Sequence, residues 1–411
     1  MLKSKLFQST MIYGVTNALY SGIPFLILPF IITILEPAEY GKTDLFRTIS
    51  MVLTPILGFS TVQSISYYYL ELTKERFKTF VSSIQIFQLF TAIVAFILLT
   101  ISSYWISKEY YVLLSLCILF YLFNQFTEGI LTIFRIENKP IKYMTIRISS
   151  ILIELLLMVI MFKYFKSKDW TVRVYPIVVT SLLIAIYSFY LFRKMEYTIN
   201  FSKALITKAL IYSTPLILHM LSGYILNIGD RFFIKLYLTD KELGEYAVAY
   251  QIGMSVNFFF TSFNLAWTPT YFKWMKEKQN EKINKVRKLV YYTIIGIAVG
   301  IVIIWKIFES YIQKNTSYNI AFSLVFIILI SNVFLSFYKF ESNYFLVNKT
   351  TKKLSVITFT SALISIIFNL LLIPYFEILG AAIATLISFI FMFFIVKYKI
   401  SNEKKNISNH I

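Results

Sequence analysis

Residues 80–103 read FVSSIQIFQLFTAIVAFILLTISS, a run of 24 residues without a single charge. A helix of about 20 apolar residues spans the hydrocarbon core of a bilayer, where its backbone groups find hydrogen-bond partners only within the helix itself. This stretch therefore predicts a transmembrane helix. Comparable runs recur from one end of the chain to the other, and they are longer than the core of a soluble domain requires.

Counted between charged breaks, these runs predict an all-α integral membrane protein of about twelve transmembrane helices. The predicted spans are 10–35, 44–70, 80–103, 110–134, 145–165, 174–192, 209–237, 246–270, 289–308, 320–344, 354–373 and 380–397. The composition agrees, because 57% of the residues are hydrophobic and only 15% are charged, whereas soluble domains hold about 25% charged residues. The even number of spans places both termini on the same side of the membrane.

The distribution of lysine and arginine indicates which side that is. The N-terminus and every second connection hold 27 of the 40 basic residues, the alternate connections hold 8, and 5 lie within spans. Short cytoplasmic loops are enriched in basic residues, so both termini are predicted to be cytoplasmic. This pattern also accounts for most of the formal charge of +19, and we expect no nucleic-acid partner because no basic surface stands apart from the spans.

A short polar connection at 193–208 divides six spans from six. The turn Leu35–Gly41 and its counterpart Leu238–Gly244 share leucine, glutamate and glycine at an offset of 203 residues. Repeats related by an axis along the membrane normal are common in transporters, so the turns favour two similar halves. The predicted parts are an N-terminal lobe at 1–192, a cytoplasmic interfacial linker at 193–208, a C-terminal lobe at 209–397 and a cytoplasmic tail at 398–411.

Polar residues within the spans are the candidates for function. A charge in the middle of a membrane helix costs about 2.5–3.5 kcal/mol on the insertion scale, so such residues usually face a cavity or a partner. The candidate cavity cations are Arg47, Arg147, Arg231, Lys235 and Lys339, and the candidate polar cavity residues are Asn124, Asn332, Ser336 and Asn343. Basic residues predominate in this set, so a cavity that they line attracts an anion. Asn332, Ser336, Lys339 and Asn343 recur at spacings of four, three and four residues, so they form a polar stripe on one helical face. Helix packing remains the alternative for such a stripe. Pairing with Asp230 or with a neighbouring helix remains the alternative for Arg231.

Three acidic residues are candidates for ion coupling. Glu128, Glu154 and Asp230 lie within predicted spans, where a carboxylate can bind and release a proton or a sodium ion. The alternative for Glu128 and Glu154 is a structural pair with Arg135 or Arg147 on the same helix.

Signatures of catalysis are weak. Gly41-Lys42-Thr43 resembles the end of a phosphate-binding loop, but Glu36 stands where that loop needs a glycine. Cys117 is the only cysteine, which excludes an intramolecular disulfide and a cysteine metal cluster. We therefore predict no catalytic residue, no metal ligand and no cofactor.

Three blocks of the chain resemble the Wzx-type polysaccharide flippases of the multidrug/oligosaccharidyl-lipid/polysaccharide (MOP) exporter superfamily. They are Leu35–Gly41 after a proline-bearing span, Gly229–Ile234 with Leu243–Tyr250, and Asn369–Pro374 with Gly380–Thr385. Their order, spacing and span count cover most of the chain. Lys42 and Glu377 depart from the apolar residue and the glycine that the family commonly has at these positions.

The resemblance implies two pseudo-symmetric six-helix lobes around a central cavity in the bacterial cytoplasmic (inner) membrane. It implies a flippase for O-antigen, or lipopolysaccharide, biosynthesis, whose substrate is an undecaprenyl-pyrophosphate-linked oligosaccharide moved from the cytoplasmic to the periplasmic leaflet. The expected partners are membrane lipid, a proton or sodium gradient and a polysaccharide polymerase. Unaided, the polar head group would lose its water in the hydrocarbon without replacement.

Two other functions are compatible with this sequence. A drug or cation exporter of the same superfamily is expected to have an acidic excess in its cavity, which is opposite to the pattern here. A membrane glycosyltransferase or O-antigen polymerase usually has a large periplasmic loop, and the longest exterior connection here, near 309–319, has about a dozen residues.

Overall fold

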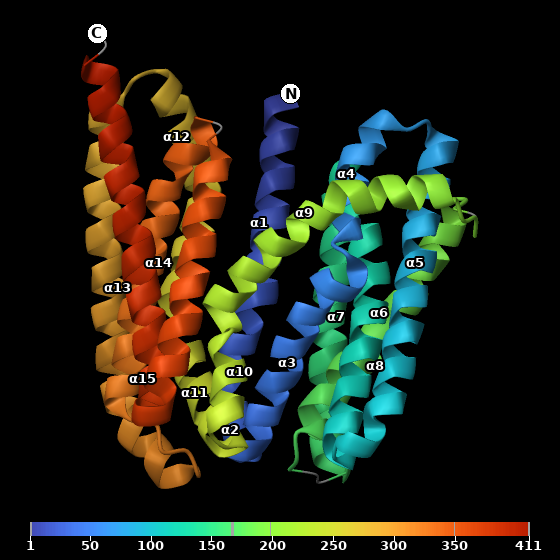
Figure 1. Cartoon of the computed structure of the whole chain (residues 1–411), viewed down its shortest axis with the longest axis horizontal. Coiled ribbons are helices and arrows are strands. Elements are labelled where there is room, and N and C mark those ends of the chain that lie inside the picture. Colours follow the sequence, from blue (N-terminus) through green and yellow to red (C-terminus); the bar gives the residue numbers. More distant parts are fainter. Residues whose placement is uncertain (1, 166–167, 198, 349, 410–411) are drawn as a thin grey trace. The chain divides into compact units, whose positions relative to one another are not determined.

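The computed structural model describes residues 2–165, 168–197, 199–348 and 350–409, and every regular element within these ranges is a helix (Figure 1). The predicted all-α class is thereby confirmed. In chain order the elements are α1 (Leu2–Leu26), α2 (Leu28–Ile34), α3 (Pro37–Gly58), α4 (Thr61–Glu71), α5 (Lys74–Ile101), η1 (Ser102–Trp105), α6 (Lys108–Ile136), α7 (Pro140–Ile160), η2 (Met161–Phe165), α8 (Thr171–Lys194), α9 (Lys203–Ile228), α10 (Asp230–Tyr237), α11 (Asp240–Gly253), α12 (Ser255–Lys276), α13 (Asn280–Asn315), α14 (Phe322–Val347) and α15 (Thr351–Asn409). The predicted tail continues past Asn409 into residues outside the described ranges.

Within the described part of the chain, nine helices are long and apolar enough to cross a membrane, and the bent pair α3 and α4 makes a tenth. The prediction of a multi-pass membrane protein is confirmed, whereas the number twelve stays a prediction. The bend of the pair is 41°. It has a local cause, because Phe59 and Ser60 have φ values of 47° and 52° and so interrupt the helix after Gly58.

The longest helix, α15, contains two of the predicted spans. Glu377 has φ 52° and ψ −135°, which no helix residue adopts. A methyl group added at Gly380 would lie 2.4 Å from the carbonyl oxygen of Leu372, although eight residues of straight helix extend about 12 Å. The chain therefore folds back here. The positive φ at Glu377 is also the physical reason why glycine suits this position.

By their contacts, the described residues form two compact units. Unit 1 comprises Met1–Tyr20 and Thr43–Leu221, and unit 2 comprises Ser21–Lys42 and Ser222–Ile411. Three helices, α1, α3 and α9, each begin in one unit and end in the other. The predicted lobes were divided once along the chain, at 193–208, whereas the contacts assign segments from both halves of the chain to each unit. The lobe boundaries stay a prediction.

Each unit has its own apolar core around one central helix. In unit 1, α6 packs against α4, α5, α7 and α8, and Ile130, Ile133 and Phe134 on its second half are fully buried. In unit 2, α14 packs against α11, α12, α13 and α15. Half or more of α14 is buried, so the polar residues of this helix lie inside the unit.

The two turns that share a sequence pattern cross each other in unit 2. A methyl group added at Gly41 would lie 2.1 Å from the carbonyl oxygen of Asp240, and one added at Gly244 would lie 1.7 Å from the carbonyl oxygen of Pro37. Pro37 and Asp240 are separated by the same 203 residues as the two glycines. The contact is therefore reciprocal, which gives these turns a local two-fold relation. Only glycine allows two backbones to approach this closely.

Local sequence signals set the starts of the two crossing helices. Pro37 is the first residue of α3, a position where the missing N–H of proline costs nothing. At the start of α11, the Thr239 side chain accepts a hydrogen bond from the Glu242 N–H while the Glu242 carboxylate accepts one from the Thr239 N–H. This capping box satisfies two backbone donors that would otherwise have no partner.

Two backbone N–H groups of the predicted linker at 193–208 donate hydrogen bonds to serine hydroxyls of α5. The N–H of Asn200 donates to Ser82 Oγ at 3.0 Å, and the N–H of Ser202 donates to Ser83 Oγ at 2.9 Å. The residues from Lys203 onward are the first turns of α9. The linker is therefore partly continuous with the following span.

Candidate substrate-binding surfaces

Lys339 of α14 is a cation inside unit 2 whose described neighbours include no carboxylate. Its Nζ donates a hydrogen bond of 3.0 Å to Asn257 Oδ1 on α12. No acidic side chain of the described residues lies within ion-pair distance of this ammonium group. An ammonium group in a membrane helix is expected to have a counter-ion, and a neutral amide does not supply one. The arrangement leaves this charge available to an anion.

One turn further along α14, Asn343 continues the same polar face. Its Nδ2 donates to Asn264 Oδ1 at 3.0 Å, and its Oδ1 accepts a hydrogen bond from Thr268 Oγ1 at 3.1 Å. Both partners belong to α12. The predicted polar stripe on α14 therefore meets a second polar stripe on a neighbouring helix.

Asn332 and Ser336 belong to the same stripe and, like Asn343, are buried. Asn332 Nδ2 donates to the carbonyl oxygen of Ile328 at 2.9 Å, and Ser336 Oγ donates to the carbonyl oxygen of Asn332 at 2.8 Å. Side chains that bond only the backbone of their own helix are typical of packing positions. The packing alternative therefore has geometric support at these two residues.

In unit 1, Arg147 of α7 joins residues of three helices. Its guanidinium forms a 2.8 Å ion pair with Glu128 of α6. The same group lies over the ring of Tyr20 at 4.6 Å and near the ring of Tyr143 at 5.7 Å. The Tyr143 hydroxyl donates to Asn17 Oδ1 at 2.8 Å. A cation on an aromatic face keeps part of its stabilisation without water, so Glu128 and the two tyrosine rings hold this arginine in place.

Glu154 also pairs across helices. Its carboxylate forms an ion pair of 2.7 Å with Arg173 of α8, whose side chain is only 2% exposed. The expected alternative, in which the acidic residues pair with Arg135 or Arg147 on their own helix, was wrong in its partners: Glu128 and Glu154 each pair with an arginine of a neighbouring helix. Arg173 escaped the sequence prediction because it lies just before the apolar run of its helix.

Asn124 and Arg47 are the candidates without polar partners. Both side chains are partly exposed in unit 1. Among the residues that the structure describes, neither forms a hydrogen bond or an ion pair. Asn124 lies one turn before Glu128 on α6. It therefore lies on the same helical face as the carboxylate that pairs with Arg147.

Arg231 forms an ion pair with Asp230. This is the pairing that the sequence offered as the alternative to anion binding. The two side chains lie 2.8 Å apart and are almost fully buried. Asp230 also accepts a hydrogen bond from the Tyr246 hydroxyl, and the Arg231 guanidinium lies 4.4 Å from the centre of the Tyr250 ring. Lys235, one turn on, forms an ion pair with Asp240 at 2.6 Å.

A further buried polar cluster lies beside the bend between α3 and α4. Gln88 Nε2 donates to Thr61 Oγ1 at 3.2 Å and to Gln125 Oε1 at 3.3 Å, and all three side chains are buried. The Thr61 hydroxyl donates in turn to the carbonyl oxygen of Gly58, the last residue of α3. These bonds satisfy polar groups freed by the broken helix, which is how membrane proteins tolerate such breaks.

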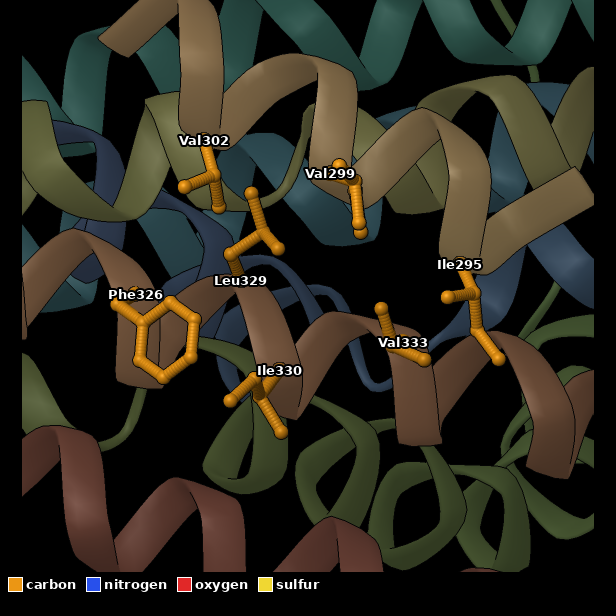
Figure 2. A pocket seen from close by; sticks show the side chains of 8 residues that line it. Ile295, Val299, Val302, Phe326, Leu329, Ile330 and Val333 are labelled. Carbon is orange, nitrogen blue, oxygen red and sulfur yellow. The ribbon is translucent and has the colours of Figure 1, made fainter. Parts of the chain in front are cut away.

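Unit 2 also has an apolar groove of about 250 Å³ between α13 and α14. Figure 2 shows Ile295 and Val299 of α13 opposite Leu329 and Val333 of α14, with Phe326 at one end. All eight lining residues are apolar. Such a surface suits hydrocarbon and offers nothing to a phosphate or a sugar, and none of the polar stripe residues of α14 lines it.

Residues 6–275 match the family described as "Polysaccharide biosynthesis protein". The chain belongs to this family. Among curated proteins it is similar to the "Lsg locus putative protein 1" of Haemophilus influenzae, with 24% identity over 398 residues that cover 92% of this chain and 95% of that protein. An "Uncharacterized membrane protein" of the same organism is 23% identical over 396 residues, covering 92% and 94%.

Solved structures of the MOP superfamily have the same fold as this member of the polysaccharide biosynthesis family. An inward-facing multidrug resistance MATE family transporter of that superfamily matches with a TM-score of 0.69 and 16% identity, over 96% of each chain. The lipid II flippase MurJ, in an inward closed conformation, matches with a TM-score of 0.69 and 14% identity, over 92% of this chain and 87% of that chain. The predicted resemblance to the flippases of this superfamily is confirmed, and at these identities the solved structures support the fold alone.

The polar residues on α12 are what the sequence prediction missed in this family member. Asn257, Asn264 and Thr268 lie at spacings of seven and four, which places them on one helical face. The same criterion had selected the stripe on α14. The spacing was therefore present in the sequence, but an uncharged polar stripe is equally typical of helix packing, so spacing alone does not distinguish the two.

Proposed function

We propose that this chain is a flippase that moves prenyl-diphosphate-linked saccharides from the cytoplasmic to the periplasmic leaflet of a bacterial inner membrane. The substrate is the undecaprenyl-pyrophosphate-linked repeat unit of a surface polysaccharide such as O-antigen. In this proposal the chain is a transporter and not an enzyme. It works by alternating access to the two sides of the membrane. Membership in a polysaccharide biosynthesis family supports a saccharide substrate, and basic residues within the spans, Lys339 above all, support a diphosphate.

The observation that carries the proposal is the ammonium group of Lys339. It lies on α14, in the interior of a unit whose spans are apolar, and its one hydrogen bond within the described residues goes to the neutral amide of Asn257. Burying a charge without a counter-charge is costly. A diphosphate that arrives from the cytoplasm supplies that counter-charge, and Lys339 is accordingly the capture site in this proposal.

The arginines of unit 1 are proposed to act later on the path. Arg147 keeps its guanidinium against two tyrosine rings while it pairs with Glu128, and Arg47 has no such partner among the described residues. A guanidinium can bind a phosphate through two parallel hydrogen bonds. Exchange of the Glu128 carboxylate for a phosphate would let Arg147 receive the substrate, and Glu128 would then be free to bind a proton or sodium ion.

The competing functions place different demands on the polar residues. An exporter of cationic drugs needs an accessible carboxylate without a basic partner. Glu128, Glu154 and Asp230 each pair with an arginine. This pairing favours an anionic substrate.

A polysaccharide polymerase stays a proposed partner of the chain, and it would receive the flipped repeat unit.

The test is transport by the full chain in proteoliposomes. Lipid-linked saccharide extracted from cells that make this protein is placed in the outer leaflet, and its translocation is followed by the accessibility of its sugar to a lectin. Lys339→Gln is expected to slow translocation by tenfold or more, because a hydrogen bond to a charged group contributes about 1.5–3 kcal/mol. Lys306→Gln is the matched control, since Lys306 is exposed on α13 and pairs with Glu309. Wild-type rates in Lys339→Gln contradict the proposal.

A further inference from the structure

A polar face runs along α12 from Asn257 to Thr268. Asn257, Thr261, Asn264 and Thr268 follow one another at spacings of four, three and four residues, so they line one side of the helix. From the first to the last they extend over about 16 Å. We name these four residues the α12 ladder.

The α12 ladder begins beside the proposed diphosphate site. Asn257 Oδ1 accepts the hydrogen bond of Lys339 Nζ, and Asn264 and Thr268 bond Asn343 one turn along α14. Away from Lys339, this polar surface consists of amide and hydroxyl groups alone. A ligand held at Lys339 by its phosphates therefore meets neutral donors and acceptors along the next 10 Å or so of α12.

Exposure separates Thr261 from ordinary helix packing. Thr261 is exposed, and Asn257, Asn264 and Thr268 are partly exposed, whereas Asn332, Ser336 and Asn343 on α14 are buried. The Thr261 hydroxyl has a long contact of 3.5 Å with Asn257 Oδ1 on its own helix and bonds nothing on α14 among the described residues. Joining α12 to α14 does not require this hydroxyl. Exposed polar groups on a helix among membrane spans indicate a wetted surface rather than lipid.

We propose that the α12 ladder binds the saccharide next to the diphosphate and determines which saccharides are accepted. The inference rests on the proposed function and deepens it. Each amide offers a carbonyl acceptor and two N–H donors, and each hydroxyl offers both. Sugar hydroxyls need the same mixture of donors and acceptors. A site that hydrogen-bonds a ligand hydroxyl discriminates strongly against ligands that lack it, because its own polar groups are then left unpaired.

Equilibrium binding to the purified full chain in nanodiscs tests this assignment with two probes. One is lipid-linked saccharide extracted from cells that make this protein, and the other is a prenyl diphosphate of the same chain length without sugar. Thr261→Val and Asn264→Ala are expected to weaken binding of the saccharide probe about three- to tenfold and to leave binding of the bare diphosphate within twofold. Lys339→Gln is expected to weaken binding of both probes.

Matched variants guard against a structural explanation. Thr360→Val on α15 removes a hydroxyl that bonds only the backbone of its own helix, and binding of both probes should stay at the wild-type level. Thr261→Ser should bind the saccharide probe as the wild type does, because serine keeps the hydroxyl. Ladder variants that bind both probes as the wild type does, or that lose both equally at an unchanged melting temperature, overturn the inference. A wild-type chain that binds neither probe removes the proposed function itself, which is a different outcome.

Discussion

At the scale of single residues, the charged side chains of this protein divide into those with a carboxylate partner and those without. Arg147, Arg173 and Arg231 each form an ion pair shorter than 3 Å. Lys339 has an amide partner instead. Since a charge in a membrane helix needs compensation, the paired arginines are compensated by the protein, and we propose that an anionic ligand compensates Lys339.

The pairing of Arg231 predicts a structural effect of Arg231→Lys. Lysine keeps the charge but lacks the planar group that lies against Tyr250 and bonds Asp230. We expect a fall in the free energy of unfolding of about 1–3 kcal/mol, measured by thermal unfolding in detergent, with diphosphate affinity unchanged in the folded fraction. The reverse pattern, normal stability with weakened diphosphate binding, would assign Arg231 to the substrate site.

The acidic partners of Arg147 and Arg173 remain the candidates for ion coupling. We expect translocation by Glu128→Gln/Glu154→Gln to lose its dependence on pH and sodium, because neither amide can bind and release a cation. The measurement is flipping in proteoliposomes across imposed gradients. Each single variant should also be less stable, since the partly buried Arg147 or the buried Arg173 then loses its carboxylate. A double variant that responds to both gradients as the wild type does places the coupling elsewhere.

At the scale of helices, the crossing of α3 and α11 leaves no room for a side chain. Backbone atoms of Pro37 and Asp240 occupy the space that a methyl group at the opposite glycine needs. Backbone cannot rotate aside as a side chain can, so the two helices must move apart to accommodate any larger residue.

Gly41→Ala and Gly244→Ala are accordingly expected to destabilise the protein by about 1–3 kcal/mol each. Their effects should be less than additive, because the first substitution already separates the helices that the second would push apart. Gly300→Ala on α13 is the control, since nothing lies within 4 Å of the added methyl group and alanine favours the helix. Thermal unfolding of the four variants, the double included, measures this; equal stability of Gly244→Ala and Gly300→Ala contradicts the crossing.

At the scale of the whole molecule, the basic residues of the connections predict the orientation in the membrane. Cys117 is buried, and in a Cys117→Ser background single cysteines report the side on which a position lies. We expect Lys276→Cys, at the end of α12, to react with an impermeant thiol reagent only from the cytoplasm. Tyr375→Cys, 82% exposed near the reversal of α15, should react only from outside. Labelling of Lys276→Cys from outside in intact cells would contradict the predicted orientation and indicate the opposite one.

The sequence alone predicted the helices because the bilayer makes secondary structure a local matter. A backbone group in hydrocarbon must bond within its own helix, so a run such as 80–103 implies a span whatever surrounds it, and α5 at Lys74–Ile101 contains most of that run. The repeated turns were also visible in the sequence. Their leucine, glutamate and glycine pattern recurs 203 residues apart, and the two glycines prove to be the crossing point.

The partners of the polar residues were decided by tertiary structure. Helical spacing places Arg147 and Glu154 on one face, yet each bonds a residue of a different helix, Glu128 and Arg173. It also cannot tell that Asn257, 82 positions before Lys339, meets that lysine. Spacing fixes only which side of a helix a residue occupies, whereas ion pairs and hydrogen bonds between helices depend on which helices pack together. The chain therefore specifies its spans locally, and only packing brings the polar residues of different helices together.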